Sequence, residues 1–169
     1  MLIPFAGGRA KRGTVKFIAD AMLGRLAKWM RILGCDVLYE PDIDDRQLVR
    51  TAREQGRTVL TRDTILLKRK GLGDAVFIRS DDVREQMLEI RHLLNSCRGG
   101  RFARCAVCNG SLEDVPRKEE VRPAVPDFVY LNHDRFLRCS GCGKVYWEGT
   151  HYGKIRKRML EIAEGERED

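Results

Sequence analysis

Between residues 14 and 95, short runs of β-branched and aromatic residues alternate with longer stretches of helical apolar spacing. This alternation most constrains the fold, because neighbouring parallel strands need a crossover connection, usually a helix. The pattern predicts strands at residues 14–19, 35–39, 57–61 and 75–79, and helices at residues 21–33, 44–55, 64–70 and 82–94. We therefore expect an α/β fold, a parallel sheet flanked by helices on both faces.

The periodicity fails after this region, where Ser96, Gly99 and Gly100 mark a boundary. We predict a first domain over residues 14–97, a small second module over residues 98–150 and a basic helical tail over residues 151–169. Lys or Arg interrupts every apolar run well before the length of about 18 residues that a membrane span needs. The basic residues near the start follow the apolar ones, the reverse of a secretory signal. The sequence thus predicts no membrane association and a cytoplasmic location.

Four of the six cysteines form two C-x-x-C pairs, Cys105 with Cys108 and Cys139 with Cys142. Two such pairs in a short segment with little aliphatic core are typical of one tetrahedral Zn site. A glycine after each pair lets the backbone turn so that its N–H groups point at sulfur. Because four thiolates close the coordination sphere, we expect a structural metal. A redox role and an iron–sulfur site are the alternatives.

The two remaining cysteines are expected to be unpaired. Cys35 falls in an apolar strand, where a thiol behaves as a small buried hydrophobe, and Cys97 is interpreted as an incidental thiol. The long spacer between the two pairs predicts an extended hairpin or insertion over residues 117–134.

Aspartates follow each predicted strand: Asp20 the first, Asp44 and Asp45 the second, Asp63 the third, and Asp81 and Asp82 the fourth. The carboxyl ends of parallel strands share one edge of the sheet, where open α/β sheets bind ligands. Carboxylates gathered there suit Mg²⁺ or Mn²⁺, which can activate water and stabilise the leaving oxygen of a phosphodiester. Alternatively, each aspartate caps the helix that it precedes. Spacing alone leaves both interpretations open.

The chain carries a net charge of +7 from 32 basic and 25 acidic residues, a modest indication of a polyanionic partner. Arg25, Lys28 and Arg31 recur every three residues along the first predicted helix, and Arg62 precedes Asp63. These four side chains are candidates for contacts with a nucleic-acid backbone. A solvated helix face explains the same spacing equally well.

Several segments, in order, carry a resemblance to a known family. They are FIADAMLGRLAKWMRILGCD from Phe17, DDRQLV from Asp44, TVLTRD from Thr58, and the two cysteine pairs. Together they resemble the Mut-seven C-terminal RNase domain family, which is regarded as a PIN-like nuclease fold followed by a zinc ribbon. The resemblance implies a metal-dependent ribonuclease in which Asp20 and Asp63 bind the ion. The middle acid maps onto the Asp44-Asp45 pair, with Asp44 favoured.

Three functions are considered on this basis. In the first, an endoribonuclease, Asp20, Asp44 and Asp63 hold Mg²⁺ or Mn²⁺, and the basic residues and zinc ribbon hold the RNA. In the second, a non-catalytic RNA-binding zinc-ribbon protein on the same scaffold, the acids are only helix caps. In the third, aromatic residues of the ribbon dock a protein, so a protein partner or a homodimer is included among the expected partners.

Overall fold

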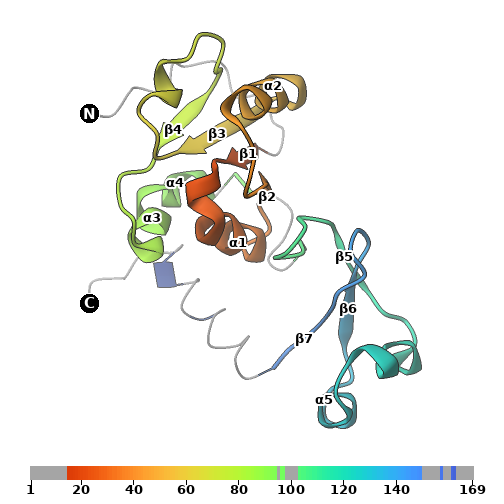
Figure 1. Ribbon diagram of the computed structural model, residues 1–169. Helices are drawn as coiled ribbons and strands as arrows, with labels where there is room; N and C mark the ends of the chain where they lie inside the picture. Colours follow the sequence, from red (N-terminus) through yellow and green to blue (C-terminus); the bar gives the residue numbers. More distant parts are fainter. Residues whose placement is uncertain (1–14, 95, 98–102, 150–156, 158–160, 163–169) are drawn as a thin grey trace, which may run out of the picture.

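The computed structural model describes residues 15–94, 96–97, 103–149, 157 and 161–162. Four parallel strands form the first sheet, in the order β2-β1-β3-β4: β1 (Lys16–Ala19), β2 (Asp36–Tyr39), β3 (Arg57–Thr61) and β4 (Ala75–Phe77). A crossover follows each of the first three strands, as the alternating pattern predicts. The predicted α/β fold class is confirmed (Figure 1).

Helices cover both faces of this sheet. On one face, α1 (Gly24–Ile32), α3 (Val83–Glu89) and α4 (Arg91–Leu94) pack over Phe17, Ala19 and Leu60. On the other face, α2 (Asp45–Gln55) and the 3-10 turn η2 (Leu66–Lys68) pack over Ile18 and Val59. Adjacent residues of one strand thus enter different cores, because side chains alternate across a sheet. Gly56 ends α2 in the left-handed conformation, with φ of 60°, where glycine has no steric penalty.

Two predicted helices are each divided in the structure. The first begins as a 3-10 turn, η1 (Ala21–Leu23), before α1 starts at Gly24. A Cβ on Gly24 would lie only 2.6 Å from the Tyr39 ring, so glycine permits the close approach of α1 to β2. The last helix divides at Ile90, which ends α3 before α4 begins at Arg91. Neither division changes the face that the helix buries.

The second unit is an antiparallel sheet in the order β5-β6-β7: β5 (Leu112–Asp114), β6 (Phe136–Cys139) and β7 (Val145–Trp147). Its small core contains Val121, Val125, Phe136 and Val145. The expected insertion is helical: η3 (Lys118–Ala124) and α5 (Asp127–Asn132) fill the connection between β5 and β6. Together with the four-cysteine cluster described below, this unit is consistent with a zinc ribbon.

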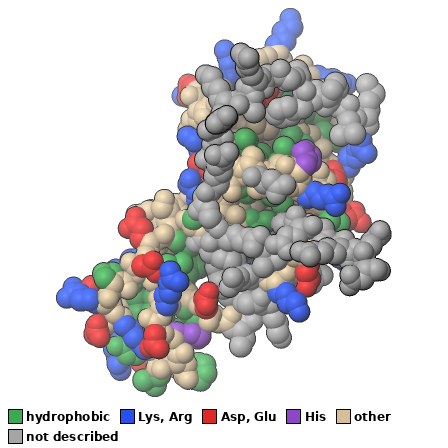
Figure 2. All heavy atoms as spheres, turned by 180° about the vertical axis from the view of Figure 1, so that it is seen from behind, with side chains coloured by type: hydrophobic (Ala, Val, Ile, Leu, Met, Phe, Trp, Pro, Cys, Tyr) green, Lys and Arg blue, Asp and Glu red, His purple; other side chains and the backbone are tan. Residues whose placement is uncertain are grey.

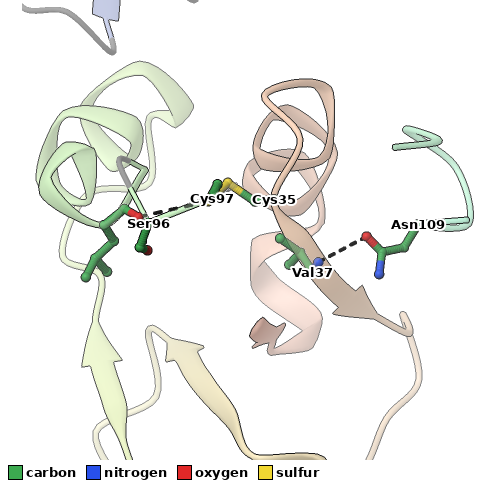
Figure 3. The surroundings of a disulfide bond; sticks show 6 residues. Cys35, Val37, Ser96, Cys97 and Asn109 are labelled. Carbon is green, nitrogen blue, oxygen red and sulfur yellow. Dashed lines mark hydrogen bonds between the residues drawn. A yellow bond between two sulfur atoms is a disulfide. The ribbon is translucent and has the colours of Figure 1, made fainter. Parts of the chain in front are cut away.

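Cys35 and Cys97 form a disulfide, so the prediction of two unpaired thiols is wrong. Their Cα atoms are 4.7 Å apart, although 62 positions separate them along the chain. Cys35 is buried as expected, directly before β2, and Cys97 follows α4 (Figure 3). The prediction failed because only the packing of α4 beside the start of β2 brings the two sulfurs together.

Most of the predicted tail lies outside the described residues. Within it, Lys157 and residues 161–162 are helical, and Ile162 is buried in the same core cluster as α1 and α3. The chain therefore returns from the second unit to the first. Among the described residues, no helix has the length and apolar character needed to cross a membrane.

Candidate active site and metal centre

Asp20 lies at the carboxyl end of the central strand β1, and its side chain is buried. Its Oδ1 accepts a hydrogen bond from the backbone N–H of Met22 (2.9 Å), which caps η1. Its Oδ2 accepts from the Thr61 hydroxyl (2.5 Å) and from the backbone N–H of Arg62 (2.9 Å). The carboxylate of Asp20 is thus fixed against the end of the neighbouring strand, β3.

Asp63 is connected to Asp20 through Thr61. The Thr61 hydroxyl donates to Asp20 and accepts from the backbone N–H of Asp63 (2.9 Å). The Oδ1 of Asp63 accepts from the backbone N–H groups of Ile65 (2.6 Å) and Leu66 (3.3 Å), at the start of η2. One threonine therefore holds both aspartates at the same edge of the sheet.

Asp44 is the N-cap of α2, in the connection that leaves β2. Its Oδ1 accepts from the backbone N–H groups of Gln47 (2.9 Å) and Arg46 (2.8 Å). The hydrogen bond from Gln47, followed by that from Arg46, holds the pKa of Asp44 below its usual value. Asp45 forms an ion pair with Arg69 (3.1 Å) instead. Both acids of the pair are thus at the start of α2, and only Asp44 caps it.

The structure brings the candidate acids to one edge but not into one direct coordination shell. The strand order puts Asp20 between the segments that carry Asp44 and Asp63, because β1 lies between β2 and β3. Three carboxylates that bind one Mg²⁺ directly must place their oxygens within about 4.2 Å of one another, twice the metal–oxygen distance. Among the described residues, the only group of three or more ligand side chains that could hold a metal consists of the four cysteines.

The capping interpretation is correct for Asp20, Asp44 and Asp82, whose side chains cap η1, α2 and α3. Asp63 accepts from the backbone N–H groups just before and at the start of η2. Capping leaves ligand capacity, because the Oδ2 atoms of Asp44 and Asp63 receive no hydrogen bond from the described residues. The donor chemistry fits Mg²⁺ or Mn²⁺, which take carboxylate oxygens and usually keep several waters. The described side chains do not fit a site with three direct carboxylate ligands.

The predicted basic contacts divide into two groups. Arg25 and Lys28 are exposed on α1, and Nε of Arg62 is buried without a hydrogen-bond partner among the described residues. Arg31, in contrast, is buried and donates to three carbonyls: Val37 (2.9 Å), Ala106 (3.3 Å) and Val107 (2.8 Å). The Arg31 guanidinium, assigned from the sequence to contacts with nucleic acid, instead joins the two units through these carbonyls.

The four predicted zinc ligands converge. The sulfurs of Cys105, Cys108, Cys139 and Cys142 all lie within 4.8 Å of one another. Cys105 lies 3.7 Å from Cys142, and Cys108 lies 3.3 Å from Cys139. A tetrahedron of sulfurs at about 2.3 Å from Zn²⁺ has edges of about 3.8 Å, so the cluster could bind zinc.

Backbone and side-chain donors surround the cluster. The N–H groups of Gly141 and Cys142 point at the Cys139 sulfur, each at 3.4 Å, as predicted for a cysteine knuckle. Burial raises the pKa of Cys105, but hydrogen bonds, first from Tyr146, outweigh it and lower the pKa to about 6. Burial, followed by the contact with Cys105, raises the pKa of Tyr146. The surroundings of Cys105 therefore favour the thiolate that a metal requires.

Asn109 is a residue whose role the sequence analysis missed. It follows the first cysteine pair and adopts the left-handed conformation, with φ of 68°, where a glycine had been expected to act. Its Oδ1 accepts from the backbone N–H of Val37 (3.0 Å), on the edge strand β2 (Figure 3). Its Nδ2 donates to Asp36 (2.8 Å). The only available signal was asparagine itself, the non-glycine residue that most readily adopts this conformation.

Asp36 connects this contact to the first unit. It is buried and pairs with Arg57 (2.7 Å) and Arg104 (3.3 Å). Burial raises the pKa of Asp36, but hydrogen bonds from Arg57 and Asn109 outweigh it and leave the pKa below its usual value. The first cysteine knuckle is therefore attached to β2 through a buried, charged network.

Comparison with protein families matches residues 15–159 to the Mut7-C RNAse domain. The chain belongs to this family. The match spans both units of the Mut7-C chain, so the parallel sheet and the cysteine-bearing sheet fall within one family domain. No curated protein and no solved structure matches the chain. Membership in the Mut7-C family confirms the resemblance stated above and supports a ribonuclease that acts on RNA.

Proposed function

We propose that this Mut7-C protein is a metal-dependent endoribonuclease whose reaction takes place at the carboxyl edge of β1, β2 and β3. The observation that carries the proposal is the match to an RNase domain over residues 15–159. The network that joins Asp20, Thr61 and Asp63 at this edge supports the location. The predicted domain limits, 14–97, 98–150 and 151–169, are kept as part of this proposal.

Asp20, Asp44 and Asp63 would hold Mg²⁺ or Mn²⁺, in part through water, and Asp45 remains the alternative to Asp44. A divalent ion there supplies a water of lowered pKa and stabilises charge on the leaving oxygen. Asp20 would be a rigid ligand, because Thr61 and the N–H groups of Met22 and Arg62 fix its carboxylate. Asp44 and Asp63 would each contribute the oxygen that helix capping does not use.

The protein would hold the scissile phosphate with cations beside this edge. Arg62 follows the strand whose last residue contacts Asp20, and its buried Nε lacks a partner among the described residues. A phosphate oxygen would satisfy that donor. Arg25 and Lys28 extend the basic surface along α1, the helix that follows Asp20 and η1.

The zinc ribbon would bind a structural Zn²⁺ through its four cysteines. The hydrophobic core of the ribbon has four buried members among the described residues, which is too little to stabilise a unit of this size without a staple. A protein expressed in zinc-containing medium should contain about one Zn per chain, and Cys139→Ser should lose it. Wild-type protein that contains no zinc after such expression would contradict this part of the proposal.

The test of catalysis uses asparagine, which caps helices about as well as aspartate but lacks the charge. Labelled structured RNA is incubated with and without Mn²⁺, using wild type, Asp44→Asn and Asp63→Asn. We expect Mn²⁺-dependent cleavage in wild type and a loss of about a hundredfold or more in each variant. Asp82→Asn is the matched control, because Asp82 also caps a helix but follows β4, the outer strand. Equal cleavage by all four proteins would refute the site.

The second candidate function, RNA binding without cleavage, is favoured by one observation. The described acids cap helices and do not form a group that could hold a metal. RNA that binds to wild type but is never cleaved, with intact zinc content, would support this function over the first.

A further inference from the structure

A groove of about 620 Å³ lies between α2 and the segment that leads from η2 toward β4. Figure 1 shows α2 beside this crossover, on the sheet face that α1 and α3 do not occupy. Arginines 46, 50 and 53 line it from α2, and Arg69 and Lys70 line it from the crossover. We call this surface the basic groove. None of its residues belongs to the contacts predicted from the sequence.

The groove is strongly positive. Five of its lining side chains are cationic and one, Glu54, is anionic. Arg46, Arg50 and Arg53 follow the spacing i, i+4, i+7, so they share one face of α2 over about 10 Å. Like charges this close repel one another unless an anion lies among them.

The protein neutralises these charges only in part. Arg50 pairs with Glu54 (3.2 Å), but both side chains are largely exposed, and such pairs contribute little. Arg69 pairs with Asp45 (3.1 Å). Within the ranges that the structure describes, Arg46, Arg53 and Lys70 have no ion pair. The groove therefore keeps unsatisfied positive charge at its surface.

The zinc ribbon differs in this respect. Most of its described cations pair with its own acids, as Arg117 does with Glu120 and Arg135 with Asp114. On the face in Figure 2, basic and acidic side chains are interspersed over this unit. The basic groove, with five cations against one acid, is therefore the better binding surface for a polyanion.

The position of the groove connects it to the candidate active site. Its first arginine, Arg46, is two residues from Asp44, and Arg69 contacts Asp45 at the start of α2. Because α2 crosses back over the sheet, the groove runs from the carboxyl edge along the helix. No aromatic side chain lines it, so it offers no stacking platform for bases.

We propose that the basic groove binds the sugar–phosphate backbone of the RNA substrate and leads the strand to Asp44, a proposal that rests on the proposed ribonuclease function. A guanidinium group can donate two parallel hydrogen bonds to the oxygens of one phosphate. Such contacts position a strand but do not depend on its base sequence. Binding in the groove is therefore strongly dependent on salt and tolerant of sequence.

The test measures binding of a short fluorescein-labelled oligouridylate by anisotropy, with no added Mg²⁺ or Mn²⁺. Arg50→Gln/Arg53→Gln should weaken binding about 25-fold at about 0.1 M salt and reduce the salt slope by about 1.4, because each lost contact with a single strand contributes about 0.7. The difference from wild type should vanish near 1 M salt. Glu54→Gln should tighten binding about fivefold, because it removes the one acid of the groove.

The matched control is Arg84→Gln/Arg91→Gln, which removes the same charge from α3 and α4 on the other sheet face. A loss as large as that of the groove variant would overturn the proposal, because net charge alone would then explain it. Wild-type cleavage with an unchanged groove variant would refute the groove and leave the ribonuclease function intact. Absence of RNA binding and cleavage in wild type would refute both.

Discussion

Replacement of Asn109 by alanine should separate the first cysteine knuckle from β2. Asn109 is buried, and its two hydrogen bonds hold the edge strand N–H of Val37 and the carboxylate of Asp36. Loss of the first bond leaves a buried N–H unsatisfied, at about 1–3 kcal/mol, and the charge-assisted bond to Asp36 contributes about 1.5–3 kcal/mol. Alanine in the left-handed conformation costs about 1 kcal/mol more.

The free energy of unfolding should therefore fall by about 3.5–7 kcal/mol, which lowers Tm by roughly 7–28 °C for a chain of this size. The assay is thermal and urea unfolding at fixed zinc content, with Zn measured in each sample. Asn109→Gly should recover about 1 kcal/mol, because glycine adopts the left-handed conformation freely. Asn132→Ala is the matched control, since Asn132 makes one exposed bond to Phe128. A loss below about 1 kcal/mol in Asn109→Ala would refute the docking role.

Three further predictions concern stability. Reduction of the Cys35–Cys97 disulfide, which closes a loop of 62 positions, should lower the free energy of unfolding by about 4 kcal/mol. The measurement is the fall in Tm, which Cys97→Ser should reproduce without reductant. Equal Tm values for the reduced and oxidised protein would contradict this prediction. The pKa of Asp36 is lowered in the folded state, so the ionised carboxylate stabilises the fold fully above the ordinary value of 3.8, and this contribution is lost as pH falls through the lowered pKa. Urea titrations from acid to neutral pH should show this loss in wild type and not in Asp36→Asn. Removal of Zn²⁺ by a chelator should unfold the ribbon before the parallel sheet. In Trp29→Phe, where Trp147 is the remaining tryptophan, its fluorescence should change in a separate transition from the loss of helical circular dichroism; one joint transition would show that the two units unfold together.

Local patterns were sufficient for most of the fold. The period of apolar residues distinguishes strand from helix, and alternation of the two requires parallel crossovers, so the order of elements could be read before any contact was known. The end of α2 at Gly56 was also predictable, because a glycine cap depends only on the backbone conformation of that residue and of the last helical turn. The four-cysteine site was equally predictable, because the spacing within each C-x-x-C pair lets its two sulfurs bind the same ion.

The candidate active site was predictable only in part. The segments that carry Asp20, Asp44 and Asp63 leave the carboxyl ends of β1, β2 and β3, which parallel topology puts at one edge of the sheet. The hydrogen bonds that Asp44 and Asp63 accept from nearby backbone N–H groups are local, and the sequence offered them as one of two alternatives. The hydrogen bond from Thr61 to Asp20 was not predictable, because it depends on the packing of β3 beside β1. Arg31 shows the same limit: its spacing indicates an exposed face, yet the second unit covers it.

What the sequence determined by itself depends on neighbours along the chain: the order of strands and helices, from the periodicity, and the cysteine spacing. The tertiary structure decided which distant groups meet. The Cys35–Cys97 disulfide, the Asn109 contact with β2 and the clustering of arginines from α2 with Arg69 each join segments that no local pattern relates. Such contacts arise from packing of whole elements against one another, and a residue's type alone does not specify its partner in that packing.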